Sequence, residues 1–341
     1  MYLTAEEEKM FNGAYGKPIS EAMKILTAIG DINEADRLIP IKSAHIAGLS
    51  YKSHGDAGIE YVENLMRAGA RARIYTTLNT IGVDVERWQE IGLPQNFASK
   101  QLQIARCYES MGCTPFYSCT PYYGSNLPLF GENIGSHIGS IVGDRVPLVR
   151  GLPRSTSVED LVAMGAGMAS AGSVALFHAE GITPEANSTN TNVTDRGLEL
   201  ITIDSGTIAK AREKLSSLSS GAVDYVAIGC PHASVRQLRE IASLLEGKRV
   251  HPNVRLWIHT STSMRTIAER IGYVKAIERA GGCVTCDMCT VLGPPEALGI
   301  EHAVTNSSKL AFYAPGSNHM KVAYGDLHAC IDAAVQGKWN D

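Results

Sequence analysis

Apolar positions along the chain recur with two alternating spacings. Helical spacing of about 3.6 residues predicts helices at 19–29, 57–68, 97–111, 158–170, 208–217, 234–245 and 264–279. Short runs rich in β-branched and other apolar residues predict strands at 38–47, 70–75, 114–118, 173–177, 223–228, 254–259 and 283–288. Strands that alternate with helices favour parallel pairing, so the pattern predicts an α/β fold.

Two stretches interrupt this alternation. Residues 52–56 form a polar turn pattern, and residues 122–154 are rich in glycine, proline and small polar side chains, which is typical of a boundary or an excursion. A chain of 341 residues is also too long for one small core. We therefore expect three α/β subdomains, at 1–130, 131–247 and 248–341.

Composition limits the classes of function. The 44% hydrophobic and 19% charged residues are typical of a soluble globular protein, and a formal charge of −4 provides no basic field for nucleic acid. No apolar run reaches membrane-spanning length, and the first residues lack a signal-peptide pattern. We expect a cytoplasmic protein that binds neither nucleic acid nor membranes.

Three of the eight cysteines follow predicted strands: Cys119, Cys230 and Cys289. Ligands of open α/β sheets gather at the carboxyl ends of strands, so these thiols are expected to converge. Thiolates favour soft metal centres, iron–sulfur clusters among them. Cysteines within or at the ends of helical patterns are interpreted as small buried hydrophobes: Cys107, Cys113 and Cys330.

The run Cys283-x-x-Cys286-x-x-Cys289 is similar to part of a ferredoxin ligand motif. Its β-branched neighbours favour a strand instead, in which side chains three positions apart point to opposite faces. We therefore expect a single ligand, Cys289, from this run. A zinc site is a weaker interpretation, because paired C-x-x-C knuckles on both sides are missing.

The number of ligands bears on the chemistry. Three thiolates on a [4Fe–4S] cluster leave one iron without a protein ligand, and such an open iron can act as a Lewis acid. Four-cysteine clusters usually carry electrons, so the count favours dehydration. A [2Fe–2S] cluster and mononuclear iron remain open alternatives, as does an iron–sulfur electron-transfer protein.

Polar residues at the same strand ends are candidates for the rest of a site. The catalytic candidates, which could equally be packed or capping residues, are His45, His178, His232 and Glu180. The candidates for binding an acidic substrate, which could equally form turns or caps, are Ser50, Thr76, Thr77, Asn79, Asn306, Ser307 and Lys309.

Several segments, in this order, resemble the large, catalytic subunit of the aconitase X family. They are Ala44-His45-Ile46, Thr76-Thr77-Leu78-Asn79, Cys119-Thr120-Pro121-Tyr122, Phe177-His178-Ala179-Glu180-Gly181, Gly229-Cys230-Pro231-His232, Asp287-Met288-Cys289 and Thr305-Asn306-Ser307-Ser308-Lys309. The resemblance implies several α/β subdomains similar to the first three domains of aconitase around a central iron–sulfur cleft. It implies Cys119, Cys230 and Cys289 as cluster ligands. It also implies a hydro-lyase for a small hydroxy acid such as (R)-5-phosphomevalonate or cis-3-hydroxy-L-proline.

The chain departs from that family pattern in two places. Between Ile134 and Gly135 it lacks a family segment with a basic motif, which would suit an acidic substrate. The 341 residues also leave no room for the family's small swivelling domain, so we expect this chain to lack it. The resemblance then implies a separate small subunit that carries a catalytic serine. A catalytically silent binding subunit is the alternative that the missing segment leaves open.

Overall fold

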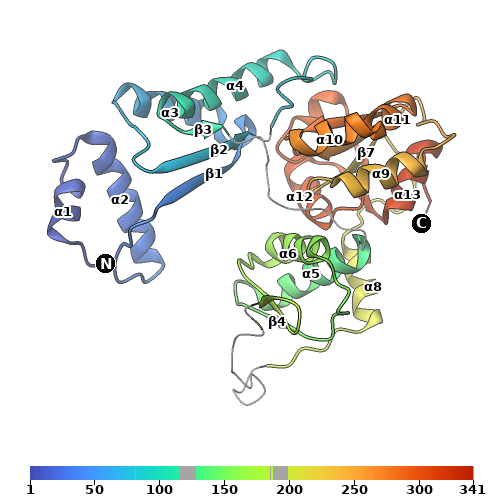
Figure 1. Ribbon diagram of the computed structural model, residues 1–341, viewed down its shortest axis with the longest axis horizontal. Coiled ribbons are helices and arrows are strands. Elements are labelled where there is room, and N and C mark those ends of the chain that lie inside the picture. The colour runs from blue at the N-terminus through green and yellow to red at the C-terminus, as the bar shows by residue number, and fades with distance from the viewer. Residues whose placement is uncertain (81, 116–127, 185, 187–198, 341) are drawn as a thin grey trace.

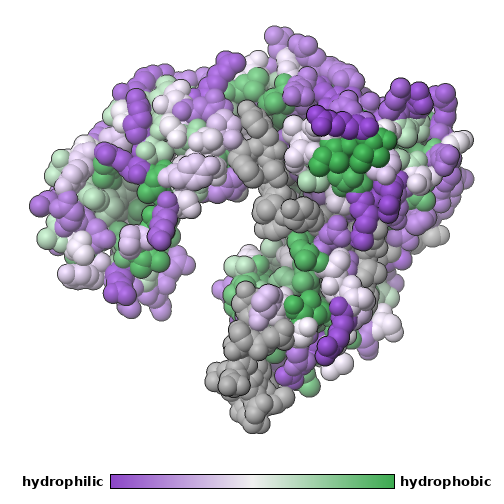
Figure 2. Space-filling model, in the orientation of Figure 1, coloured by the Kyte–Doolittle hydropathy of each residue, from purple (hydrophilic) through white to green (hydrophobic). Residues whose placement is uncertain are grey.

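The computed structural model describes residues 1–80, 82–115, 128–184, 186 and 199–340 (Figure 1). The fold is α/β, as the sequence predicted, and comprises three units that we name by position. The first unit is residues 1–115, the middle unit 128–214 and the third unit 221–340. Figure 2 shows a recess on this face of the molecule, between the N-terminal helices and the middle unit.

The first unit is a three-stranded parallel sheet with order β1-β2-β3 and two flanking helices. A helical hairpin, α1 and α2, precedes it (Figure 1). The elements are α1 (Ala5–Phe11), α2 (Lys17–Ile32), β1 (Ser43–Leu49), α3 (Tyr51–Arg67), β2 (Tyr75–Thr80), α4 (Gln95–Ser110) and β3 (Thr114–Pro115). Thr4 caps α1, because its hydroxyl accepts from the Glu7 N–H in a capping box.

The middle unit is built on two helices that contact each other through their backbones. A Cβ at Gly135 would lie 2.0 Å from the Met164 carbonyl oxygen, and one at Gly172 would lie 1.9 Å from that of Gly139. The glycines therefore permit close packing, and part of the stretch predicted as a boundary or an excursion, residues 128–142, forms a helix. The elements are α5 (Pro128–Val142), β4 (Leu148–Val149), α6 (Val158–Gly172), β5 (His178–Ala179) and α8 (Ser205–Lys214).

The third unit contains a five-stranded parallel sheet with order β11-β10-β7-β8-β9. Its strands are β7 (Tyr225–Ile228), β8 (Arg255–Thr260), β9 (Gly282–Cys286), β10 (His302–Thr305) and β11 (Lys321–Tyr324). Its other elements are β6 (Gly221–Ala222), α9 (Val235–Leu244), α10 (Thr262–Ile271), α11 (Tyr273–Arg279), η2 (Pro295–Leu298), α12 (Ser308–Asn318), α13 (Leu327–Gln336) and β12 (Lys338–Trp339). The expected boundary after residue 247 falls between α9 and β8, inside this unit.

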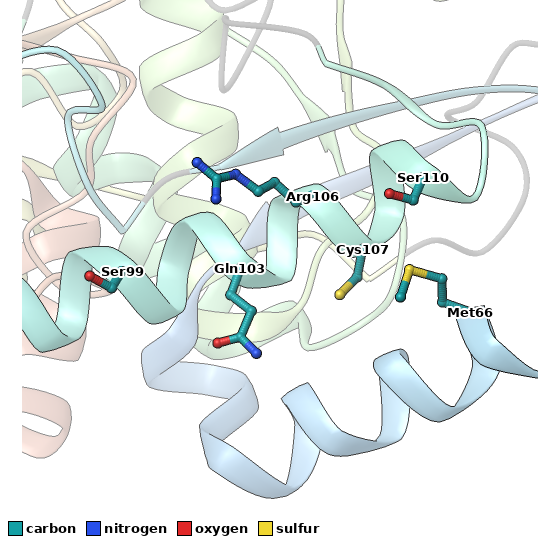
Figure 3. Close-up of a pocket in the computed structure, with 6 residues that line it drawn as sticks. All are labelled: Met66, Ser99, Gln103, Arg106, Cys107 and Ser110. Carbon is teal, nitrogen blue, oxygen red and sulfur yellow. The ribbon is translucent and has the colours of Figure 1, made fainter.

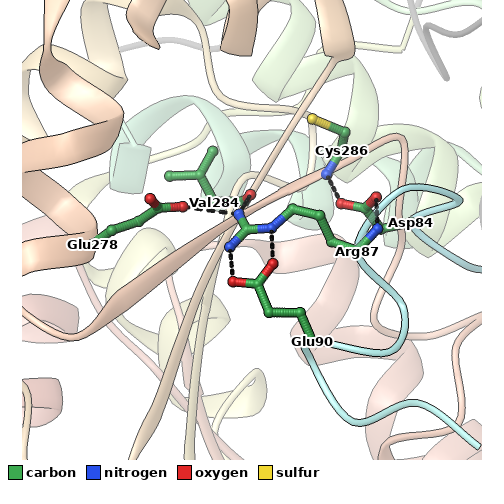
Figure 4. Close-up of polar contacts among 6 residues, drawn as sticks. All are labelled: Asp84, Arg87, Glu90, Glu278, Val284 and Cys286. Carbon is green, nitrogen blue, oxygen red and sulfur yellow. Dashed lines mark hydrogen bonds and ion pairs between the residues drawn. The ribbon is translucent and has the colours of Figure 1, made fainter.

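Polar side chains of the first unit complete the outer edge of β9 (Figure 4). Asp84 accepts from the Cys286 backbone N–H at 2.8 Å, and Arg87 donates to the Val284 carbonyl at 2.8 Å. Arg87 also pairs with Glu90 and with Glu278 of α11. Because an edge strand exposes unpaired backbone groups, these contacts both satisfy β9 and dock the first unit on the third.

Several predicted elements begin or end elsewhere in the structure. The strands predicted at 70–75 and 173–177 are found further along, as β2 and β5. The polar turn predicted at 52–56 lies within α3, which Ser50 caps, and the helix kinks there because Gly55 has a non-helical backbone (φ 61°). The helix predicted at 264–279 is divided by Gly272, whose φ of 100° ends α10 and starts α11.

Candidate metal centre

Two predicted ligands, Cys230 and Cys289, meet at the carboxyl edge of the five-stranded sheet. Cys230 follows β7 by two residues and Cys289 follows β9 by three. Both are free, half-buried thiols, and their sulfur atoms share a hydrogen bond. Parallel strands bring these positions together, as the sequence pattern predicted.

The turn before Cys230 requires glycine. Gly229 has φ 97°, and a Cβ there would lie 2.1 Å from the His259 carbonyl oxygen on the neighbouring strand. On the other side, the Ser307 hydroxyl donates to the Cys230 carbonyl. Cys230 is therefore held against both β8 and the start of α12.

Residues 289–293 form a turn that the first unit also holds. The Gly293 N–H donates to the Cys289 carbonyl at 2.9 Å. The Ser50 hydroxyl donates to the Leu292 carbonyl at 2.8 Å, and Lys52 Nζ lies 3.4 Å from the Gly293 oxygen. The position of Cys289 thus depends on contacts from a segment about 240 residues earlier in the chain.

The electrostatics favour a thiolate at Cys289. The hydrogen bond from Cys230 is the largest cause that lowers the pKa of Cys289 to about 7. The backbone N–H groups of Leu292 and Val291 and the charge of Lys309 act in the same direction, and burial opposes them. The same shared hydrogen bond, together with burial, raises the pKa of Cys230 well above its usual value. Cys289 is therefore the thiol of the pair that loses its proton first, and a thiolate is a donor suited to a soft metal.

Four other predicted residues lie around these thiols. His232 is buried, its Nε2 donates to the Met288 carbonyl at 3.0 Å, and burial lowers its pKa to about 4, so the ring is neutral near pH 7. Asn306 and Ser307 are buried, and Ser307 caps α12. Lys309 is exposed, with its charge close enough to act on both thiols.

Ser50 has a different setting from the one predicted for a substrate-binding residue. Its side chain is fully buried, and its hydroxyl accepts from the Lys52 N–H while donating to the Leu292 carbonyl. Both contacts are made to backbone. Its observed contacts therefore cap α3 and support the Cys289 turn.

The predicted residues of the first sheet are grouped on β1 and β2. His45 is exposed, with Nδ1 2.8 Å from the Thr77 hydroxyl, and the buried Thr76 hydroxyl donates to the Ile74 carbonyl. The side chain of Asn79 lies outside the described residues. The structure thus brings His45 and Thr77 together across the two neighbouring strands.

The remaining predicted residues fall elsewhere. His178 lies on β5 in the middle unit, and its Nδ1 is buried with no hydrogen-bond partner in the described part of the chain. Glu180 is exposed and pairs with Arg150 at 3.1 Å, so it does not occupy an apolar pocket. Cys119 lies outside the described residues.

Sequence reasoning missed a buried polar network beside Cys289. It joins His259 of β8 to Thr285, Thr290 and Tyr225, through contacts of 2.6 to 3.4 Å. The signal was available, because His259 ends an apolar strand just as the three predicted histidines were expected to do. Burial lowers the pKa of His259 to about 3, so its ring is neutral.

A surface pocket lies apart from the cysteine pair, between α3 and α4 (Figure 3). It is lined by Met66, Ser99, Gln103, Arg106, Cys107 and Ser110. Cys107 is 5% exposed, in agreement with its prediction as a buried hydrophobe. Nothing among these side chains links the pocket to the chemistry at Cys230 and Cys289.

The described residues fit part of an iron–sulfur site. Two thiols, backbone N–H donors to sulfur and a nearby lysine are the features that stabilise thiolate ligands. Within the described ranges no three Cys, His, Asp or Glu side chains form a complete metal site. Nor is any helix there long and apolar enough to span a bilayer.

Comparison with known proteins defines the class. The chain matches sequence models of the first, second and third domains of aconitase X, over residues 1–140, 124–213 and 223–336. A crystal structure of Thermococcus kodakaraensis aconitase X (holo-form) superimposes with a TM-score of 0.82 at 33% identity, covering 98% of this chain and all of that one. The chain therefore belongs to the aconitase X family.

Named relatives narrow the comparison further. The chain is 34% identical to the phosphomevalonate dehydratase large subunit of Methanothermobacter thermautotrophicus, over 96% of this chain and 97% of the relative. It is 28% identical to the cis-3-hydroxy-L-proline dehydratase of Pseudomonas aeruginosa, over 98% of this chain and 70% of the relative. The first alignment spans 399 positions, more than the 341 residues here, so it includes positions at which this chain has no residue.

Proposed function

We propose that this chain is the large subunit of an aconitase X hydro-lyase that removes water from a small hydroxy acid. The observation that carries the proposal is the hydrogen-bonded pair of thiols, Cys230 and Cys289, at the carboxyl edge of the third unit's sheet. Dehydratase names among relatives that align over nearly the whole chain support the reaction type.

Cys119, Cys230 and Cys289 are the proposed ligands of an iron–sulfur cluster. Once bound, such a cluster supplies a Lewis acid for a substrate hydroxyl. We propose [4Fe–4S] with one iron that has no protein ligand. The iron-to-sulfide ratio distinguishes it from mononuclear iron, and the iron content per chain distinguishes it from [2Fe–2S].

The surrounding residues can bind and orient an anionic substrate. Lys309 presents a charge near both thiols, and Asn306 is an amide beside it in sequence. Ser307 is occupied with the Cys230 carbonyl and the α12 cap, so its proposed part is to shape the loop. The neutral His232 donates to Met288 and thereby orients the residue before Cys289.

Further residues complete the proposed site from the other units. The His45–Thr77 pair and Thr76 lie on the first sheet, where Asn79 also lies, and we propose this group as a second contact to the acid. His178 and Glu180 reach the site only if substrate or partner binding brings the middle unit to it. Glu180 would then have to leave Arg150.

The proposed partner is a small subunit with a swivelling domain and a catalytic serine, acting together with this chain in the cytoplasm. The support is that several relatives that align over nearly their whole length are named large subunits. Among candidate substrates, (R)-5-phosphomevalonate is the first choice because the relatives named for it reach 34% identity against 28% for those named for cis-3-hydroxy-L-proline.

The test is dehydration by the assembled complex. The chain is produced with a small subunit, purified without oxygen, analysed for iron and sulfide, and assayed with both hydroxy acids. Cys230→Ser and Cys289→Ser are expected to lose iron and activity together, whereas Cys107→Ser, from the first unit, is expected to keep both. A complex that binds iron fully in both serine variants would refute the ligand assignment.

A second candidate function is a catalytically silent binding subunit. The alignment positions at which this chain has no residue favour it, because an anion-binding segment is expected there. Under this alternative, the complex binds (R)-5-phosphomevalonate or cis-3-hydroxy-L-proline without turnover even when iron and sulfide are complete. Isothermal titration alongside the dehydration assay distinguishes the two functions.

A further inference from the structure

Thr290, the residue after Cys289, is held by two side chains of the sheet beneath it. Its hydroxyl oxygen lies 2.7 Å from the Tyr225 hydroxyl and 2.7 Å from His259 Nε2. His259 Nδ1 in turn lies 2.6 Å from the Thr285 hydroxyl. All four side chains are buried, so the only partners they have are one another and the groups that pack around them.

The contacts assign a direction to these hydrogen bonds. A neutral imidazole has one N–H donor and one acceptor nitrogen. If Tyr225 donates to Thr290, then Thr290 donates to His259 Nε2, and His259 Nδ1–H donates to Thr285. In the reverse order Thr290 donates to Tyr225, and the only remaining contact for the Tyr225 hydroxyl hydrogen is the one to His259, at 3.4 Å. The first order therefore fixes the Thr290 hydroxyl as both acceptor and donor.

Thr290 occupies the start of the turn that presents Cys289. Gly293 N–H donates to the carbonyls of both Cys289 and Thr290, at 2.9 and 3.3 Å. The same turn directs the backbone N–H groups of Val291 and Leu292 at the Cys289 sulfur. Fixing the Thr290 side chain thus restricts the backbone that sets the direction of the sulfur.

We propose that Thr290 is a positioning residue that holds Cys289 against Cys230, and that Tyr225 and His259 act through it. The inference rests on the proposed function, because it gives Cys289 a task as a metal ligand. Thr290 makes no contact with the reacting atoms. Its task is to preserve the approach of the two sulfurs before any metal arrives.

The experiment measures thiol reactivity in the metal-free, full-length chain. Iodoacetamide is added, and alkylation of Cys289 is followed by mass spectrometry, with Cys283 of the same chain as an internal reference. Thr290→Val removes the hydroxyl and keeps the branched shape. Because it loosens the turn whose N–H groups and contact with Cys230 stabilise the reactive thiolate, it is expected to lower the Cys289 rate on the order of five- to tenfold, as for one buried hydrogen bond lost. Thr290→Ser restores the hydroxyl and is expected to return the rate to within about twofold of wild type.

A matched control separates positioning from general loss of stability. Ile258→Val lies on β8, one residue before His259, with its side chain fully buried in the apolar core, and it weakens the fold without touching a polar partner. It is expected to leave the Cys289 rate unchanged. If Ile258→Val and Thr290→Val lower the rate equally, or if neither lowers it, the positioning role is refuted. If Thr290→Val does not fold, Tyr225→Phe, which removes one of the two partners, takes its place with the same criteria.

A second measurement uses Co²⁺ alone as the probe. Its absorption reports the number and geometry of thiolates bound, independently of turnover. Thr290→Val is expected to lower the apparent Co²⁺ affinity, measured from the thiolate absorption band, about tenfold. Cys289→Ser is expected to remove the band. An unchanged band in Thr290→Val overturns the proposal. An unchanged band in Cys289→Ser, with Thr290→Val still altering alkylation, refutes the ligand assignment and leaves the positioning intact.

Discussion

Gly229 provides the sharpest test of how the fold places Cys230. Its φ of 97° is in the left-handed region that disfavours side chains, and a Cβ would lie 2.1 Å from the His259 carbonyl oxygen. Both strands at this point are central in the five-stranded sheet, so neither backbone can retreat into solvent. Gly229→Ala therefore combines backbone strain with a steric clash.

The two contributions can be estimated separately. The left-handed conformation costs a residue with Cβ about 1 to 2 kcal/mol. Forcing an additional methyl group into a packed interior costs about 1 to 3 kcal/mol more. Gly229→Ala should therefore lower the free energy of unfolding by about 2 to 5 kcal/mol. The displacement should also separate Cys230 from Cys289, because Cys230 is the next residue.

Gly247→Ala is the matched control. Gly247 has φ 70°, and a Cβ there would meet nothing within 4 Å, so it experiences the strain without the clash. We expect it to cost about 1 to 2 kcal/mol and to leave metal binding unchanged. The assay is urea unfolding followed by tryptophan fluorescence, for which the buried Trp257 of β8 is a reporter, together with iron content. Equal destabilisation and equal iron content in the two variants would refute the steric argument.

Three further predictions follow from single contacts. Asp84→Asn removes the buried carboxylate that accepts from the Cys286 N–H, so it should lower the free energy of unfolding by about 1 to 3 kcal/mol and increase proteolysis between the first and third units. Unchanged cleavage would contradict the docking role. Ser50→Ala should cost about 1 to 2 kcal/mol by urea unfolding, since it removes both a helix cap and the bond to Leu292, whereas Ser50→Thr should restore much of the stability. Finally, burial depresses the pKa of His259 to about 3, so below about pH 6.5 the unfolded chain takes up a proton there while the folded chain does not. The free energy of unfolding should therefore fall by about 1.4 kcal/mol for each unit by which the pH is lowered from 6 to 4. In a His259→Gln variant, the plot of this free energy against pH should be less steep.

The sequence by itself determined the elements whose signals are local. Thr4 and Ser234 begin helices with capping boxes, because each side chain satisfies backbone groups only three residues away. The apolar runs before Cys230 and Cys289 form strands of one parallel sheet. Since parallel strands share a carboxyl edge, the convergence of these two thiols was predictable without any knowledge of distant contacts.

Only the tertiary structure decided where chain segments far apart in sequence meet. The glycine-rich composition of 122–154 predicted a boundary or an excursion, yet residues 128–142 form a helix whose Gly135 lies too close to the backbone of α6 for any side chain. Ser50 was a substrate candidate by its position after β1, but its hydroxyl is directed to Leu292, and no local pattern encodes that contact.

The same reason explains the network that sequence reasoning missed. Tyr225, His259 and Thr290 come from three separate segments, and each alone reads as an ordinary residue of a strand or turn. Burial removes water from all three, so their polar groups must pair with one another. Local sequence specifies which backbone shapes are possible, whereas the desolvation of polar groups in a shared interior specifies which of those shapes must meet.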